Sequence, residues 1–174
     1  MGTPDGSKRL YKTLCGVLDA LRSEAPLAEK AYHPPPGNPD ALIQARSRAL
    51  LHLFLKARFG LVRFEDREVF VTDGADDGGI DAYYIDHRNK YIYVLQSKFR
   101  ATAENFVSTT LTPSDLLKME VSRILKGKKV AENGKPYNDR IRSLQRAIRN
   151  YLMPGATRPK LYFWGIRRTY HPGN

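Results

Sequence analysis

The sequence predicts an α/β fold in which helices flank a small mixed β-sheet of about four strands. Two observations predict it. Apolar residues recur every three or four positions near both ends of the chain, which is the spacing of an amphipathic helix, and short runs of β-branched and aromatic residues lie between them. With 174 residues, of which 41% are hydrophobic, the chain is long enough to bury the core of one domain.

The first third of the chain predicts two helices joined by a stiff connector. Residues 7–23 place their leucines on one side of a helix, and the run from Pro34 to Pro39 cannot be helical. A second helix is expected from Asp40, near its N-cap, to Phe59, and Gly60 closes it. The apolar residues of this helix occupy more than one face, which indicates packing on two sides.

Three strands are expected in the middle of the chain, at residues 69–71, 80–85 and 91–99. The polar residues 86–90 separate the second strand from the third and predict a hairpin turn. Pairing about that turn joins residues whose numbers sum to about 176 or 177, so Asp81 falls opposite Gln96 within one residue.

The second half of the chain predicts two more helices and a last strand. The helices are expected over residues 112–126 and 139–151, with a basic loop between them, and the strand over residues 161–166. The expected organisation is an N-terminal helix with its connector, residues 1–38, followed by one compact domain, residues 39–174.

Positive charge is concentrated in the second half. The chain has 29 Lys and Arg against 18 Asp and Glu, a net charge of +11, and residues 88–174 hold 18 of these basic residues but only 5 of the acidic ones. Such a surface favours a polyanionic partner, with a nucleic acid as the first expectation and an anionic membrane as the second. Among the nucleic acids we favour DNA. The candidate phosphate contacts are a group of lysines and an arginine stripe with helical spacing, namely Lys126, Lys128, Lys129, Arg142, Arg146 and Arg149. A solvated basic face without a partner is the alternative.

The composition also excludes several classes. Cys15 is the single cysteine, so neither an internal disulfide nor a cysteine-based zinc site can form, and its place on the apolar side of the first helix indicates a core residue. No apolar run approaches the roughly 20 residues of a membrane span. The first residues lack the basic and apolar regions of a secretory signal. We expect a cytoplasmic protein without a membrane partner.

The residues with the clearest chemistry lie at the expected open end of the hairpin. Asp81, Gln96 and Lys98 bring a carboxylate, an amide and an ammonium group to one end of the sheet. Because Mg²⁺ prefers oxygen ligands, the expected ligands are Asp81, the side-chain carbonyl of Gln96 and the backbone carbonyl of Ser97. Lys98 is suited to hold a metal-bound water and to stabilise charge that develops on a phosphate. The group predicts phosphodiester hydrolysis, with Asp81, Gln96 and Lys98 as catalytic residues, and a structural salt bridge between Asp81 and Lys98 is the alternative.

These residues also carry a family resemblance. Asp81, followed by Gln96-x-Lys98 on the next strand, resembles the Gln variant of the PD-(D/E)xK nuclease motif, as in Mrr-like restriction enzymes. The runs from Asp76 to Asp86 and from Val94 to Phe99 are similar to the amino-terminal part of the abortive-infection phage-resistance (AIPR) proteins. The resemblance implies a restriction-endonuclease-like core, Mg²⁺ or Mn²⁺ as cofactor, nucleic acid as substrate and a role in anti-phage defence. It is also compatible with a nuclease portion of a longer protein.

The sequence departs from that motif at two places. Gln96 stands where Glu is usual, which removes one negative charge from the expected metal site, and the helix over residues 40–59 contains no Glu. The further carboxylate stays open among Glu65, Glu68, Asp73, Asp76 and Asp77.

Other interpretations stay open beside the nuclease. The same fold with too few carboxylates to cut would be a module that binds nucleic acid or a phage component. A structural or oligomerisation domain would instead pack the helix over residues 40–59 on a partner chain, and a homodimer suits an enzyme that cuts both strands of a duplex. Gly78 and Gly79 are interpreted as a turn into the strand. Four tyrosines are interpreted as sheet packing rather than as base-stacking residues, namely Tyr83, Tyr84, Tyr91 and Tyr93.

Overall fold

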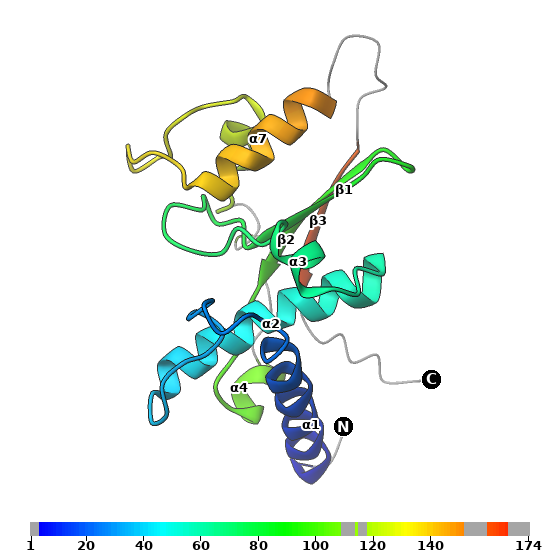
Figure 1. Cartoon of the computed structure of the whole chain (residues 1–174), viewed down its shortest axis with the longest axis vertical. Coiled ribbons are helices and arrows are strands. Elements are labelled where there is room, and N and C mark those ends of the chain that lie inside the picture. The colour runs from blue at the N-terminus through cyan, green and yellow to red at the C-terminus, as the bar shows by residue number, and fades with distance from the viewer. Residues whose placement is uncertain (1–3, 109–113, 115–117, 152–159, 167–174) are drawn as a thin grey trace. The chain divides into compact units, whose positions relative to one another are not determined.

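The computed structural model describes residues 4–108, 114, 118–151 and 160–166. Its helices are α1 (Pro4–Arg22), α2 (Pro39–Phe59), α3 (Phe64–Glu68), α4 (Ala103–Ser108), α6 (Val121–Leu125) and α7 (Asp139–Tyr151), and its strands are β1 (Ala82–Asp86), β2 (Tyr91–Ser97) and β3 (Lys160–Ile166). The structure therefore combines helices with a small sheet, which confirms the mixed class (Figure 1). Within these residues, no helix is both long and apolar enough to cross a membrane.

Two compact units make up the chain, and they divide after Phe64 and after Gln96. The first contains α1, α2 and α4, and the second contains β1, most of β2 and β3, α6 and α7. The division that the sequence analysis expects after residue 38 falls inside the first unit.

The first unit is held by the packing of α1 on α2. Cys15, Leu18 and Leu21 recur along one side of α1 and are buried, as the helical spacing predicts. Beside this apolar contact, an Arg46 nitrogen on α2 lies 2.7 Å from an Asp19 carboxylate oxygen on α1. The hydrogen bond from Arg46 is the main reason that the pKa of Asp19 is lowered. The two helices are thus joined by an ion pair at the edge of their apolar contact.

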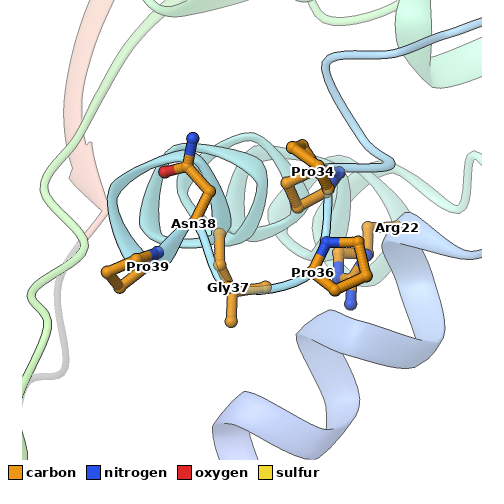
Figure 2. Close-up of a pocket in the computed structure, with 8 residues that line it drawn as sticks. Arg22, Pro34, Pro36, Gly37, Asn38 and Pro39 are labelled. Atoms are coloured by element: carbon orange, nitrogen blue, oxygen red, sulfur yellow. The ribbon is translucent and has the colours of Figure 1, made fainter.

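The proline-rich connector ends in the cap of α2. Asn38, two residues before the expected Asp40, is the N-cap, and its side chain accepts a hydrogen bond of 3.0 Å from the backbone N–H of Ala41. The helix begins two residues before the bulk of its apolar pattern because Pro39 suits the first helical position, where no N–H is needed. Gly60 ends the helix in the left-handed conformation, as expected. The connector borders a hollow of about 450 Å³ that Arg22 and Leu42 also line (Figure 2).

A β-hairpin is the centre of the second unit. β1 and β2 pair antiparallel from Ala82 opposite Leu95 to Asp86 opposite Tyr91, so the paired numbers sum to the expected value. β3 lies on the other side of β2. Helix α7 covers one face of the hairpin (Figure 1). The apolar core between them comprises Ile80, Tyr83, Ile85, Ile92, Val94, Ile124, Ile141, Leu144 and Ile148, with further buried neighbours.

Two expected elements are wrong in part. Of the strand at residues 69–71, only Val71 pairs, as an isolated antiparallel bridge to Ala82, because Val69 and Phe70 form the turn that follows α3. The ordered strands are therefore β1, β2 and β3, one fewer than the expected four in the part of the chain that is described. The helices α3 and α4 were not expected, since both are too short for a periodic pattern to mark them.

The helix expected over residues 112–126 is also corrected. Ser114 and α6 (Val121–Leu125) are helical, residues 118–120 between them are not, and residues 112, 113 and 115–117 lie outside the described residues. The reason is a contact with the turn at Gly78 and Gly79. The backbone N–H of Glu120 donates to the Gly78 carbonyl at 2.8 Å, and a Cβ on Gly79 would lie 3.4 Å from the Lys118 carbonyl oxygen. Backbone that serves this turn cannot also continue a helix.

Gly78 is where this turn fits most tightly. Its φ is +62°, and an added Cβ would lie 3.0 Å from Cε1 of Tyr137 and 3.1 Å from Cδ1 of Ile124. Both neighbours are fully buried, so neither can move aside freely. The glycine is thus required by its backbone conformation and by the space around it.

We expect Gly78→Ala to lower the free energy of unfolding by about 2 kcal/mol or more, because left-handed strain and a core clash add. Denaturant titration followed by circular dichroism measures it. The matched control is Gly134→Ala, which has a φ of +80° and nothing within 4 Å of an added Cβ. This control carries the strain alone, and an equal loss in both variants would contradict the importance of the close contact.

Candidate metal centre

Three aspartates gather at the open end of the hairpin. Asp73, Asp77 and Asp81 each offer a carboxylate oxygen, and these three oxygens lie within 4.8 Å of one another. Each of the three residues is partly buried. Carboxylates at this spacing repel one another unless a cation or a proton lies between them. The arrangement suits a hard divalent cation that takes oxygen ligands.

The backbone of Asp81 joins the cluster to the sheet. Its N–H donates to the Leu95 carbonyl at 3.0 Å, and its carbonyl accepts from the N–H groups of Thr72 and Asp73 at 2.9 and 3.0 Å. The Thr72 hydroxyl also donates to the carbonyl of Ile80. These bonds bring the segment that carries Asp73 alongside the start of β1. Asp73 and Asp81 are therefore close because of main-chain pairing, although eight positions separate them in the sequence.

Asn138 fixes the loop between these two aspartates to the start of α7. Its side-chain amide nitrogen donates to the carbonyls of Thr72 and Ala75 at 3.2 and 3.1 Å. Its side-chain oxygen accepts from the backbone N–H of Ile141 at 2.9 Å, which is the bond of a helix N-cap. Its own N–H donates to the Asp76 carbonyl at 3.1 Å. One side chain thus caps the helix and holds the acidic loop.

The Asp77 side chain holds the backbone of the loop on both sides of its own position. One of its carboxylate oxygens accepts from the Gly79 N–H at 2.8 Å and the other from the Gly74 N–H at 3.1 Å. Burial raises the pKa of Asp77, the negative charges of Asp73 and Asp76 add to the rise, and the two backbone bonds oppose it. Ionising Asp77 is therefore costly without a cation to offset its burial.

Gln96 adds an oxygen on the same face of the sheet. Side chains alternate along a strand, so Gln96 shares the face of Ile92 and Val94, which pack in the core below α7. By the same alternation Asp81 shares the face of Tyr83. The side-chain oxygen Oε1 of Gln96 is buried, and no group in the described part of the chain donates a hydrogen bond to it. A buried amide oxygen without a donor is free to face a cation.

The expected site residues divide between the two units. Asp81 and Gln96 belong to the second unit, and each directly adjoins the strand pair of Ala82 and Leu95. Ser97, the last residue of β2, and Lys98, which follows it, belong to the first unit. The contribution of the Ser97 carbonyl and of Lys98 stays a prediction from the sequence.

The structure also selects among the five carboxylates that the sequence analysis left as candidates for a further metal ligand. Asp73 and Asp77 join Asp81, whereas Glu65, Glu68 and Asp76 lie outside this group of described residues. Glu68 instead lies 3.0 Å from a guanidinium nitrogen of Arg140. Asp76 has a φ of +56° and serves as a turn residue. Spacing gave no signal for this choice, because the loop from Thr72 to Asp81 has no regular period.

A basic surface begins beside the cluster. Arg142, Arg146 and Arg149 are all exposed along α7, as their spacing predicts. Arg142 pairs with Asp139, and Arg146 donates to the Ser143 hydroxyl at 2.8 Å. Such exposed contacts contribute little to the stability of the fold, and another anion can readily replace them.

The lysine loop lies next to this stripe. Lys126, Lys128 and Lys129 are exposed, and the Lys128 carbonyl accepts a hydrogen bond of 2.8 Å from the Gln145 side chain on α7. Gln145 lies between the turns that carry Arg142 and Arg149, so lysines and arginines border one another. Because α7 begins at the residue after Asn138, this basic surface extends from the end of the helix that holds the acidic loop.

Comparisons with models of protein families, with curated proteins and with solved structures find no match.

We expect Asn138→Ser to separate the two roles of Asn138. Serine is as good an N-cap as asparagine, so the stability of α7 should stay within about 0.5 kcal/mol, but it cannot reach both loop carbonyls. Hydrogen exchange should therefore quicken at the amides of Gly74 and Gly79, while those of α7 change little. Asn138→Ala, which removes both roles, is the control and should cost about 1 kcal/mol or more. Equal protection of the loop amides in Asn138→Ser and the native protein would contradict the tether.

The raised pKa of Asp77 predicts a pH dependence of stability. The folded protein binds the Asp77 proton more tightly than the unfolded chain does, so this group's contribution falls as the pH rises from about 3.8 through the raised pKa. Asp77→Asn does not titrate, and its stability relative to the native protein should therefore increase with pH. Unfolding at pH 4, 5, 6 and 7 measures this difference. A constant difference across that range would show that the carboxyl is not perturbed.

Proposed function

We propose that this protein is a metal-dependent nuclease that hydrolyses phosphodiester bonds of DNA. The observation that carries the proposal is the meeting of three carboxylates at the end of the hairpin whose second strand carries Gln96-x-Lys98. The motif resemblance supports the same hairpin as part of a restriction-endonuclease-like core. It also supports a role in anti-phage defence.

Asp81 is the principal metal-binding carboxylate in this proposal. Asp73 and Asp77 replace the acidic residue that the motif lacks at Gln96, whose buried amide oxygen completes the oxygen set. When bound, Mg²⁺ or Mn²⁺ would supply Lewis acidity towards a phosphate oxygen. These residues fit such a cation because all of them offer oxygen atoms and three are carboxylates.

Lys98 acts on the reacting phosphate. Its ammonium group stabilises the negative charge that increases on the phosphate oxygens as water attacks, and it orients that water by hydrogen bonding. The oxygen of the water bonds to phosphorus, one P–O ester bond breaks, and the leaving oxygen takes up a proton. The products are a phosphate monoester and a hydroxyl end.

The basic surface holds the substrate. Arg142, Arg146 and Arg149 lie on successive turns of α7, and each is exposed and able to contact a backbone phosphate. Lys126, Lys128 and Lys129 widen the same surface. Contacts to phosphates position a nucleic acid without reading its sequence, so this surface predicts binding that weakens steeply with salt.

The test is cleavage of supercoiled plasmid, single-stranded DNA and RNA in Mg²⁺, in Mn²⁺ and in EDTA. We expect metal-dependent cutting of DNA, reduced on the order of 100-fold or more by Asp81→Asn and by Lys98→Ala. The matched control is Asp76→Asn, which removes a neighbouring carboxylate outside the cluster at a position whose positive φ suits asparagine. Its rate should equal that of the native protein.

The outcomes distinguish the proposal from its alternative. Cutting that survives both substitutions would place the chemistry elsewhere. A folded protein that binds DNA in EDTA through its arginines but never cuts would be a nucleic-acid-binding module instead. Equal losses in Asp76→Asn and Asp81→Asn would mean that total charge, not the cluster, governs activity.

A further inference from the structure

The hairpin has a second face, opposite α7, that is covered with tyrosines. Tyr83 lies in the core below α7, so the alternation of side chains turns Tyr84 to the other face. Tyr84 is paired with Tyr93 on β2, and Tyr91 lies two residues before Tyr93. Tyr162 on β3 completes the group, which we call the tyrosine face: Tyr84, Tyr91, Tyr93 and Tyr162.

The rings of this face contact one another across the strands. The ring of Tyr162 is stacked on that of Tyr93, with centroids 5.6 Å apart and an angle of 26° between the planes. Its centroid lies 4.7 Å from that of Tyr91 at an angle of 62°. Tyr93 itself is buried, whereas Tyr84 and Tyr91 are partly exposed and Tyr162 is 40% exposed. Tyr93 thus packs within the sheet, as the sequence analysis expects, whereas Tyr91, for which that analysis also expects packing, and Tyr162 present aromatic surface to solvent.

Positive charge lies at the end of this face. The turn that leads into Tyr91 contains Arg88 and Lys90, and both residues are exposed. The turn also holds one carboxylate, Asp86, which is paired with Tyr91 across the strands and accepts hydrogen bonds from the backbone N–H and the side-chain amide of Asn89, at 2.9 and 2.8 Å. Residues 86–90 thus contain two basic residues against one acidic residue. The turn is therefore cationic, in a chain with a net charge of +11. An occupant complementary to this face would combine flat aromatic groups with negative charge.

We propose that the tyrosine face binds single-stranded nucleic acid. Unpaired bases stack on the rings of Tyr91 and Tyr162, and the phosphates between them run towards Arg88 and Lys90. A duplex cannot use this face in the same way, because its bases are already stacked on one another inside the helix. The surface lies on the opposite side of the sheet from the arginines of α7, and it does not depend on the proposed cleavage.

Fluorescence anisotropy in EDTA tests the proposal without any cleavage. The probes are a labelled 12-residue oligothymidine and a labelled duplex of equal length, each titrated with the full chain. We expect Tyr162→Ala to weaken binding of the single strand about five-fold or more and to leave duplex binding unchanged. Tyr162→Phe keeps the ring and removes only the hydroxyl, so it should bind the single strand as the native protein does.

The charged turn has its own variant. Arg88→Gln combined with Lys90→Gln should weaken single-strand binding and reduce its dependence on salt concentration, because two phosphate contacts are lost. Arg146→Gln on α7 is the comparison, and it should affect the duplex more than the single strand.

Two results would overturn the proposal. One is a loss of affinity in Tyr162→Ala that is equal for the single strand and the duplex, or absent for both. The other is obtained with the native protein, so it does not depend on whether a variant folds. Ultraviolet cross-linking to an oligonucleotide containing 5-bromouracil is expected to give adducts at Tyr91 or Tyr162. Adducts found only outside the tyrosine face would exclude it as the binding site.

Discussion

The close contact between the turn at Gly78 and the pair formed by Tyr137 and Glu120 determines the geometry of the second unit. The Tyr137 hydroxyl donates to a Glu120 carboxylate oxygen, while the Glu120 N–H donates to the Gly78 carbonyl. Burial and the bond to Glu120 raise the pKa of Tyr137 to about 12, so the phenol stays protonated and remains a donor. The hydrogen bond between this buried donor and its charged acceptor then holds the connection from α6 to α7 next to the turn. The break before α6 follows from this contact, which also holds the turn that leads into β1 against the core.

The acidic loop shows how a fold can hold like charges together. Asp73, Asp77 and Asp81 are brought within 4.8 Å by main-chain bonds and by Asn138, none of which requires the carboxylates to attract one another. Their mutual repulsion is therefore an energy that a divalent cation would relieve. The same helix that starts beside this loop carries exposed arginines away from it. Negative and positive groups are thus separated along one helix, a distribution that the proposed nuclease would use to hold a cation and a phosphate backbone at different places.

The two faces of the hairpin carry different sets of side chains because side chains alternate along each strand. One face carries Ile92, Val94 and Gln96 towards α7 and the acidic loop, and the other carries the tyrosine face. Only a side-chain period of two allows seven residues of β2 to serve both surfaces at once. The proposed cleavage site and the proposed single-strand surface therefore share a backbone but no side chain.

Local patterns in the sequence predicted much of this architecture. The helices near both ends, the hairpin and its register, and the exposed stripe of Arg142, Arg146 and Arg149 all depend on periods that neighbouring residues set. Asp81 and Gln96 were chosen from the sequence by that register together with their chemistry and the motif resemblance. No local pattern predicts contacts between residues that are far apart in the sequence. The sequence left five carboxylates open, and only the folding of an irregular loop against Asn138, some sixty residues away, selected Asp73 and Asp77. The break in the expected helix at residues 118–120 and the place of Tyr162 beside Tyr93 were likewise decided by tertiary structure, because each depends on a partner far along the chain.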